Sequence, residues 1–591
     1  MTPAAYRTQE ATQAVLTEAM RFGLARLQRT LPAGKLAVPE RIVVSPKPME
    51  TGTAERAAEL YCGRFAFGGE LCTPGAVSPF ACTPPSERWR DALQSFVWLK
   101  DLAKADSELS RAQARSLIAD WIAVQNRVKG PGWDAPVLAR RVISWLRHAP
   151  LYLPNAGAPF HDKLMVSLGR QVRHLLGTLG RSGPGLPRLQ GAIAASLAVV
   201  CTEGLERYAE RTDDNLAREL ERQVHPDGGH ISRNPEVVLD LLADLIPLRE
   251  AYLSRDMMPP ADLVAAIDRL YPLLRLFLHG DGGLALFNGA NGTRRQLVAA
   301  ILAEDTEQAR PLTSARQSGY SRLEQGGTVV IADTGSTRGP RYDTAGQAGC
   351  LSFEMSRGTQ RIIVNCGHCG HGPVEWRTAT AATAAHSTLA VADRSNARIF
   401  THRLFQKLFG GPLMYGPETV ETDVECSDAG ALLNASHDGY LGTFGLIHRR
   451  EIYVSDDGSD IRGHDRLYAP ADAATAVQTG EPVTARFHLH PSIKANPSQD
   501  SSSIILMLPD RSGWRFSAKG ADISIEESVY FANRDVPHRT LQIVLSALST
   551  ADLTVRWGFK LIEKPGGPGG PQRPVHTRLP LEGGAMNVPN G

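Results

Sequence analysis

The chain has 591 residues, with 64 Lys and Arg against 62 Asp and Glu, 42% hydrophobic residues and a formal charge of +2. This is a globular composition, long enough for roughly four average domains. It excludes a collagen, a disordered scaffold and a dedicated nucleic-acid binder, which would carry a basic excess. No apolar run reaches the roughly 18 residues of a membrane helix, so no membrane insertion is predicted.

The beginning of the chain shows no export signal. Residues 1–31 carry charges spread along an amphipathic helical pattern, without a charged start followed by an apolar core. The eight Cys residues are too few for a disulfide scaffold of this length. Both features favour a reducing compartment, so the sequence predicts a cytoplasmic protein.

The first half of the chain is predicted to be helical. Residues 92–104 place Leu93, Phe96, Leu99 and Leu102 on one face at helical spacing. Similar patterns, joined by short Gly- and Pro-containing segments, occur at 110–128, 136–149, 188–205, 213–224, 236–253 and 261–278. Such a series of helical hairpins favours a toroid, since no sequence repeat supports a solenoid.

Short β-branched runs replace the helical patterns near residue 318. They occur at 328–333, 350–356, 361–367, 387–393, 446–454, 484–491, 503–509, 513–519, 539–547 and 553–562. Helices followed by strands indicate two segregated domains, the second an antiparallel sandwich. We therefore predict a helical domain at 1–315, a β domain at 316–563 and a disordered Gly/Pro-rich tail at 564–591.

Histidine is concentrated in the β half, which holds eleven of the seventeen His residues after position 340. In TARFHLHP, period-two geometry places Arg486, His488 and His490 on one face. That face could hold a metal or an anionic sugar, or be a solvated polar surface. NCGHCGH (365–371) contains a single C-x-x-C, and without a second pair a glycine-rich loop is favoured over zinc.

Three other segments place His beside small or polar residues. They are HPDGGHISRNP (225–235), TAAHSTL (383–389) and SHDGY (436–440). In the first, the simplest reading is helix capping, with Asn234 as N-cap and Pro235 at the first helical position. No G-x-S-x-G, P-loop, H-E-x-x-H or dinucleotide motif occurs in a fitting context.

Taken together, several of these segments resemble the heparinase II/III family of polysaccharide lyases. They are WDAPVLARRVISWL (133–146), QVHPDGGHISRNP (223–235), SGYSRLEQGGTVVIADTG (318–335), CLSFEMS, TAAHSTLAVAD, SHDGY followed by HRR, and RFHLHP. The resemblance implies an α+β multidomain protein with an incomplete α/α toroid followed by an antiparallel β super-sandwich. It also implies β-elimination on an acidic, uronate-containing polysaccharide.

The resemblance assigns roles to individual residues. His386 matches a His-Asn-Thr-like motif, with Ser387 in place of Asn, and His230 follows a DG-x-H pattern. We expect His386, His230 and Tyr320 to transfer protons. The residues expected to bind the uronate are Arg188, Gln190, Arg233, Asn234 and Tyr440. His437 and His490 match positions near a structural divalent metal, zinc or calcium.

Two motifs of the family are missing. The helix after DG-x-H normally carries a Tyr that acts as acid or base, and here that position is Val237. An Asn-Asn-His-like motif that neutralises the substrate carboxylate is replaced by PRLQG at 187–191. Valine cannot transfer a proton, so catalysis would need other groups.

Three functions remain open at this point. The first is a lyase acting on an acidic glycan in a cleft between the two domains. The second is a catalytically degenerate glycan-binding or polysaccharide-assembly protein on the same scaffold. The third is a metal-dependent hydrolase built on the His residues of the β half. The family resemblance favours the periplasm or cell envelope, against the cytoplasmic prediction from the missing signal peptide.

Overall fold

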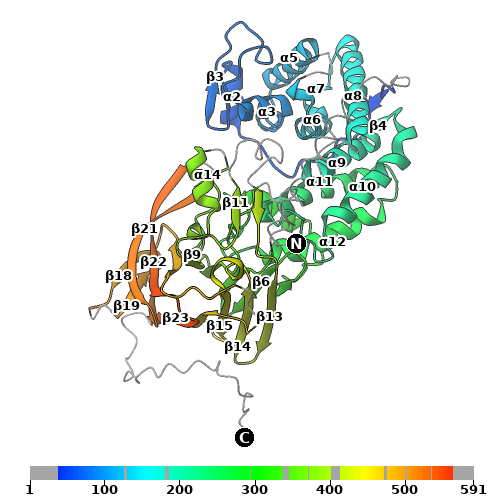
Figure 1. Ribbon diagram of the computed structural model, residues 1–591. Helices are drawn as coiled ribbons and strands as arrows, with labels where there is room; N and C mark the ends of the chain where they lie inside the picture. The colour runs from blue at the N-terminus through cyan, green and yellow to red at the C-terminus, as the bar shows by residue number, and fades with distance from the viewer. Residues whose placement is uncertain are drawn as a thin grey trace.

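The structure is a computed structural model that describes residues 37–562 with short gaps. The gaps are residues 126–129, 180–184, 293, 337–344, 371, 401–412, 472–474, 500–501 and 534–535. The predicted N-terminal helical pattern at 1–31 and the predicted tail at 564–591 lie outside the described residues. The described chain forms a helical part followed by a β part, drawn at the top and bottom of Figure 1.

Helical hairpins build the first part, as predicted. The helices are α2 (Ala54–Tyr61), α3 (Glu87–Ser95), α4 (Leu99–Ala105), α5 (Glu108–Val124), α6 (Ala135–Arg147), α7 (Ala149–Tyr152), α8 (Ala158–Thr178), α9 (Leu186–Cys201), α10 (Ala209–Gln223), α11 (Pro235–Leu253), α12 (Ala261–Leu276) and α13 (Arg295–Ala303). Two small strand pairs accompany them, β1 (Arg41–Ile42) with β4 (Thr202–Glu203), and β2 (Phe65–Phe67) with β3 (Glu70–Cys72). Together the helices form the incomplete α/α toroid.

The single helix predicted over 92–104 is wrong, because the chain breaks at Phe96. Phe96 has a φ of 58°, a left-handed conformation that ends α3. The Phe96 ring is buried. Its centroid lies 4.9 Å from that of Trp98 and 5.5 Å from that of Trp145. The break therefore places the ring in an aromatic cluster that a continuous helix would not form.

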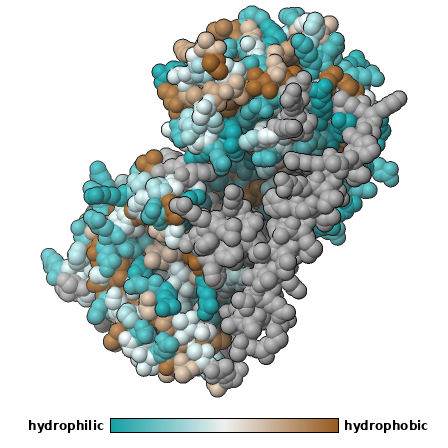
Figure 2. All heavy atoms as spheres, turned by 45° about the horizontal axis from the view of Figure 1, so that its top comes forward, coloured by the Kyte–Doolittle hydropathy of each residue, from teal (hydrophilic) through white to brown (hydrophobic). Residues whose placement is uncertain are grey.

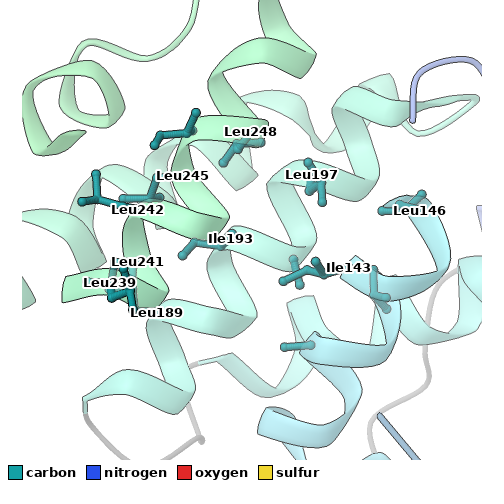
Figure 3. Packing of buried hydrophobic residues seen from close by; sticks show 14 of the residues in the cluster. Ile143, Leu146, Leu189, Ile193, Leu197, Leu239, Leu241, Leu242, Leu245 and Leu248 are labelled. Atoms are coloured by element: carbon teal, nitrogen blue, oxygen red, sulfur yellow. The ribbon is translucent and has the colours of Figure 1, made fainter. Parts of the chain in front are cut away.

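The core of the helical domain lies between α6, α9 and α11. Figure 3 shows Ile143 and Leu146 of α6, Leu189, Ile193 and Leu197 of α9, and the leucines of α11 directed toward one another. The side chains labelled on α11 are Leu239, Leu241, Leu242, Leu245 and Leu248. Because α9 is buried along almost its whole length, its sequence is apolar on every face.

Two large antiparallel sheets form the second part. The nine-stranded sheet has the order β21-β22-β17-β9-β8-β7-β6-β5, with β10 also paired to β17. The eight-stranded sheet has the order β13-β14-β15-β16-β23-β20-β19-β18. The predicted α/α toroid followed by an antiparallel β super-sandwich is confirmed.

Each of the ten predicted runs overlaps a strand of these sheets, whereas β5, β6, β13, β14, β16, β18 and β21 were not predicted. The nine-stranded sheet contains β5 (Ser314–Ala315), β6 (Tyr320–Gln325), β7 (Thr328–Asp333), β8 (Phe353–Arg357), β9 (Gln360–Val364), β10 (Leu389–Val391), β17 (Pro482–Leu489), β21 (Asp522–Asn533) and β22 (Val536–Leu548). The eight-stranded sheet contains β13 (Val420–Ser427), β14 (Gly430–His437), β15 (Ile447–Ser455), β16 (Asp460–Tyr468), β18 (Lys494–Pro497), β19 (Ser503–Met507), β20 (Gly513–Lys519) and β23 (Asp552–Ile562). A short pair, β11 (Arg398–Phe400) with β12 (Leu413–Tyr415), and the helices α14 (Val374–Ala381) and α16 (Leu441–Phe444) complete the domain.

Aromatic side chains fill the space between the two sheets. Phe353 stacks on Trp557 at 5.4 Å between centroids, and Phe487 meets the same indole at 4.9 Å. Phe487 and Leu489 point into this core, as the alternation of TARFHLHP predicts, but His488 between them is also buried. The opposite face of β17 is therefore covered by protein rather than by solvent.

Within the described ranges, no helix is both long enough and apolar enough to cross a membrane. On the face shown in Figure 2, hydrophobic residues are interspersed with hydrophilic ones over both domains.

Candidate functional site

Two turns with the same sequence connect the helical domain to the sandwich. His225–Gly229 follows α10 and His279–Gly283 follows α12, and both read His-x-Asp-Gly-Gly. In each turn the His N–H donates to the carbonyl of the second Gly, at 2.7 and 2.9 Å. The first Gly donates back to the His carbonyl at 2.9 Å in both. This five-residue repeat is visible in the sequence, although it is far shorter than a repeat of whole helical hairpins.

Each repeated turn presents its Asp to the β domain. Asp227 accepts hydrogen bonds from the backbone and hydroxyl of Ser318, at 2.8 and 2.5 Å. Asp281 forms an ion pair with Arg361 of β9 at 3.0 Å. Burial opposes ionisation of Asp281, but Arg361 holds the pKa of this carboxyl below its usual range. The two turns therefore act as docking points between the domains.

Arg233, expected to bind substrate, lies at the centre of this junction. It is only 6% exposed and adopts a left-handed backbone with φ 58°. Its guanidinium forms an ion pair with Asp333 of β7 and donates to the carbonyls of Ser318 at 2.9 Å and Gly319 at 3.0 Å. Its donors are thus directed to the β domain.

Tyr320 joins the same junction. Its hydroxyl donates to the Arg233 carbonyl and accepts a 2.7 Å hydrogen bond from the Asn288 amide, which also donates to Asp333 at 3.0 Å. The Arg233 guanidinium lies 5.0 Å from the Tyr320 ring centroid. The structure therefore brings Arg233 and Tyr320 together, in a buried network that connects the domains.

His230 and Asn234 flank Arg233 and have local partners. His230 Nε2 pairs with Gln223 at 3.0 Å and Nδ1 with Ser232 at 2.8 Å. Burial, assisted by His225, lowers the pKa of His230 to about 3. Asn234 is the N-cap of α11 and accepts a 2.8 Å hydrogen bond from the Glu236 N–H, which confirms the capping interpretation.

The other positions singled out in the helical domain lie on α9 and in the first turn of α11. Gln190 is buried, and the Arg188 guanidinium lies 3.9 Å from Glu219 of α10. Val237, at the position of the expected Tyr, lies in the first turn of α11 and is 7% exposed. The amide of Gln190 and the alkyl group of Val237 cannot act as a general acid or base, and Arg188 offers a cation rather than a proton acceptor.

His386 is buried in the β domain and is 1% exposed. Its Nδ1 pairs with the Ala382 carbonyl at 2.8 Å. Burial lowers the pKa of His386, so the ring is neutral at pH 7. Ser387, the next residue, donates to the Val364 carbonyl at 2.8 Å and accepts from the His488 N–H at 3.0 Å. It therefore links β9 to β17.

His437 belongs to a buried chain of polar groups inside the sandwich. The Gly439 N–H donates to His437 Nδ1 at 3.0 Å, so Nε2 carries the proton and faces His448 Nδ1 at 3.2 Å. His448 Nε2 then meets Asp465 at 2.8 Å. Burial and then His448 lower the pKa of His437, which agrees with two neutral rings.

The hydrogen-bonded group of His437, His448 and Asp465 does not fit a shared metal ion, because the facing nitrogens of His437 and His448 bond to each other. Among the described residues, no group of three or more His, Cys, Asp or Glu is arranged to hold a metal. His490 has separate partners, Ser492 at 2.7 Å and the Tyr530 ring at 5.3 Å. The structural zinc or calcium expected in the sandwich stays a prediction.

Tyr440 and the NCGHCGH segment also face inward. Tyr440 donates to the Leu389 carbonyl at 2.8 Å, and burial raises its pKa. Cys366 lies 3.5 Å from His488, but burial raises the pKa of the thiol to about 12 and lowers that of the imidazole to about 3. The two groups are neutral, so they do not form an activated nucleophile pair. His371 lies outside the described residues.

A small cavity of about 100 Å³ opens in the helical domain, between α6, α11 and the segment around Glu50. Four cationic side chains and three carboxylates line it: Lys100, Arg140, Arg147 and Arg294 with Glu50, Asp240 and Asp244. Lys100 pairs with Glu50 at 2.7 Å, Arg147 with Asp244 at 3.0 Å, and Arg294 with Asp240. Carboxylates of the protein therefore already pair with three of the cations that would otherwise bind a polyanion.

The comparisons with known proteins agree with this architecture. Residues 307–558 match the family described as heparinase II/III-like, C-terminal. The FtsZ-localized protein C of Caulobacter vibrioides is 31% identical over 542 residues, which cover 90% of this chain and 92% of that protein. The chain belongs to the heparinase II/III-like family.

Solved lyases of this family share the fold. A crystal structure of heparinase III has a TM-score of 0.69 at 14% identity, covering 95% of this chain and 92% of that one. The heparan sulfate lyase HepC of Pedobacter heparinus has a TM-score of 0.60 at 14% identity, covering 93% of this chain and 88% of that one. This heparinase-like protein therefore has a polysaccharide-lyase scaffold.

Proposed function

We propose that this heparinase-like protein is a catalytically degenerate member that acts by binding and assembly, with FtsZ as its partner. The observation that carries the proposal is Val237, which occupies the position of the expected Tyr acid or base. The other proton-transfer candidates, His230, His386 and Tyr320, are all buried and hydrogen-bonded. A β-elimination needs a base that reaches the sugar proton and an acid that reaches the leaving oxygen.

The charges of the cavity support the same conclusion. A uronate polymer needs cations that are free to meet its carboxylates. Here three of the four lining cations pair with Glu50, Asp240 and Asp244 within 3.0 Å. With an excess of only one cation over the three carboxylates, the cavity offers little positive charge to a polyanion and suits a neutral or zwitterionic group.

The first test is cleavage. Purified full-length protein should give no rise in the ultraviolet absorbance of unsaturated uronate with heparan-like, alginate-like or bacterial exopolysaccharide chains. His386→Ala and the more exposed His161→Ala should match the unaltered protein, and an active heparinase serves as positive control. A rise that His386→Ala alone abolishes would restore the lyase function with a rearranged set of proton donors.

The second test is the partner. The relative with 31% identity over 90% of the chain is named for its localisation with FtsZ, which supports the same association here. We expect the protein to sediment with FtsZ polymers and to stay in the supernatant without them. Retention in the supernatant, together with binding to one of the polysaccharides, would favour a glycan-binding function instead.

A further inference from the structure

Two thiols of the helical domain face each other at the surface end of the β2–β3 hairpin. Cys72 is the last residue of β3, and Cys82 lies in the turn that follows. Their sulfur atoms are 3.8 Å apart, and both residues are partly exposed. A disulfide bond is about 2.05 Å long, so the two atoms need to approach by less than about 2 Å.

The surrounding contacts already hold both thiols in place. Trp89 donates to the Phe65 carbonyl at 2.7 Å and fixes the hairpin on α3. Ser78 donates to Asp120 of α5 at 2.6 Å, and the Phe80 ring stacks on Phe96 at 5.5 Å. These contacts anchor the 73–82 segment, so the two sulfur atoms are held 3.8 Å apart before any cross-link forms.

We propose that Cys72 and Cys82 are a modification site that closes reversibly to a disulfide. The oxidant is a small disulfide such as glutathione disulfide. One Cys thiolate attacks a sulfur of the oxidant and releases a first glutathione thiolate, which leaves a mixed disulfide on the protein. The second Cys thiolate attacks the protein sulfur of that mixed disulfide and releases a second glutathione thiolate. The two Cys protons end on the two glutathiones, and two electrons pass to the oxidant.

The environment sets the order of the two steps. Burial, and then the hydrogen bond with Cys72, raise the pKa of the Cys82 thiol. A thiol with a raised pKa supplies less thiolate at neutral pH and is the slower first nucleophile. Cys72 therefore forms the mixed disulfide, and Cys82 resolves it from within contact distance.

The test uses intact mass and thiol counting of the full chain with glutathione disulfide. The Cys62→Ser/Cys426→Ser double variant, which lacks the two exposed thiols, should lose two hydrogen atoms in mass and two reactive thiols, and dithiothreitol should restore both. Cys82→Ser should accumulate one glutathione on Cys72, whereas Cys72→Ser should leave Cys82 largely unmodified. Cys62→Ser and Cys426→Ser, at exposed thiols, should still close the disulfide.

Two results would overturn the proposal. One is an unaltered protein that keeps a stable glutathione adduct on Cys72 without losing two hydrogens. The other is closure that persists in Cys72→Ser or Cys82→Ser, which would place the disulfide elsewhere. Loss of closure in either control variant would also contradict the assignment.

Discussion

Replacing Arg233 by alanine is expected to lower the free energy of unfolding by about 3–5 kcal/mol, because it leaves the buried Asp333 carboxylate without its cation. Arg233 also donates to the carbonyls of Ser318 and Gly319, so its removal leaves further buried acceptors unsatisfied. Urea unfolding followed by intrinsic fluorescence measures the loss. The effect should exceed that of any exposed ion pair in the protein.

The matched control for this prediction is Arg316→Ala. Arg316 lies 3.7 Å from Asp423, and the two side chains are 73% and 59% exposed. An exposed pair of this kind contributes at most about 1 kcal/mol. If Arg233→Ala unfolds at the same urea concentration as Arg316→Ala, the junction around Arg233 does not stabilise the protein.

Acidification should destabilise the protein steeply between about pH 6 and pH 4, by at least about 4 kcal/mol per pH unit. Burial lowers the pKa of His148 to about 4, and those of His230 and His488 to about 3. In the unfolded chain each titrates near 6.5, so below that pH these three rings alone make the unfolded state bind three more protons than the folded state. His490, with a pKa lowered to about 4, and the buried His386 and His437 add to this difference. Stability is therefore complete above about pH 6.5 and is lost as the pH falls toward the folded values.

Urea midpoints measured from pH 7.5 to pH 4 test this dependence. His230→Gln removes one titrating group, so the slope should fall by the equivalent of one proton, about 1.4 kcal/mol per pH unit. His161→Gln, at a partly exposed side chain, is the control. A midpoint that stays constant between pH 7 and pH 5 would show that these rings are not buried in their neutral form.

Much of the fold could be predicted from local patterns. Thr328–Asp333 and Gly513–Lys519 are strands with the bounds that alternation and turn residues indicate, and the helices of the first half follow their apolar stripes. Phe96 was the exception, since its helical spacing predicts continuation. Its ring instead packs against Trp98 and Trp145, and these long-range contacts outweigh the local preference.

The candidate site was less predictable, although two signals were present. The spacing of Asn234 and Pro235 predicts a helix start, and the structure confirms it. The repeated His-x-Asp-Gly-Gly turn was also visible in the sequence, but what its Asp residues contact was not. Arg233 beside this turn was expected to bind a sugar, yet it pairs with Asp333, a hundred positions away.

The sequence by itself determined the two-domain organisation, the segregation of helices and strands and the presence of valine at position 237, where the family resemblance implies a Tyr. These properties are local, because they depend on periodicity, turn chemistry and the identity of single residues. Only the tertiary structure decided that His230, His386 and His437 are buried and neutral, and that Arg233 joins the domains. Burial and pairing arise when segments far apart in the chain come into contact, and a linear pattern does not record which segments those are.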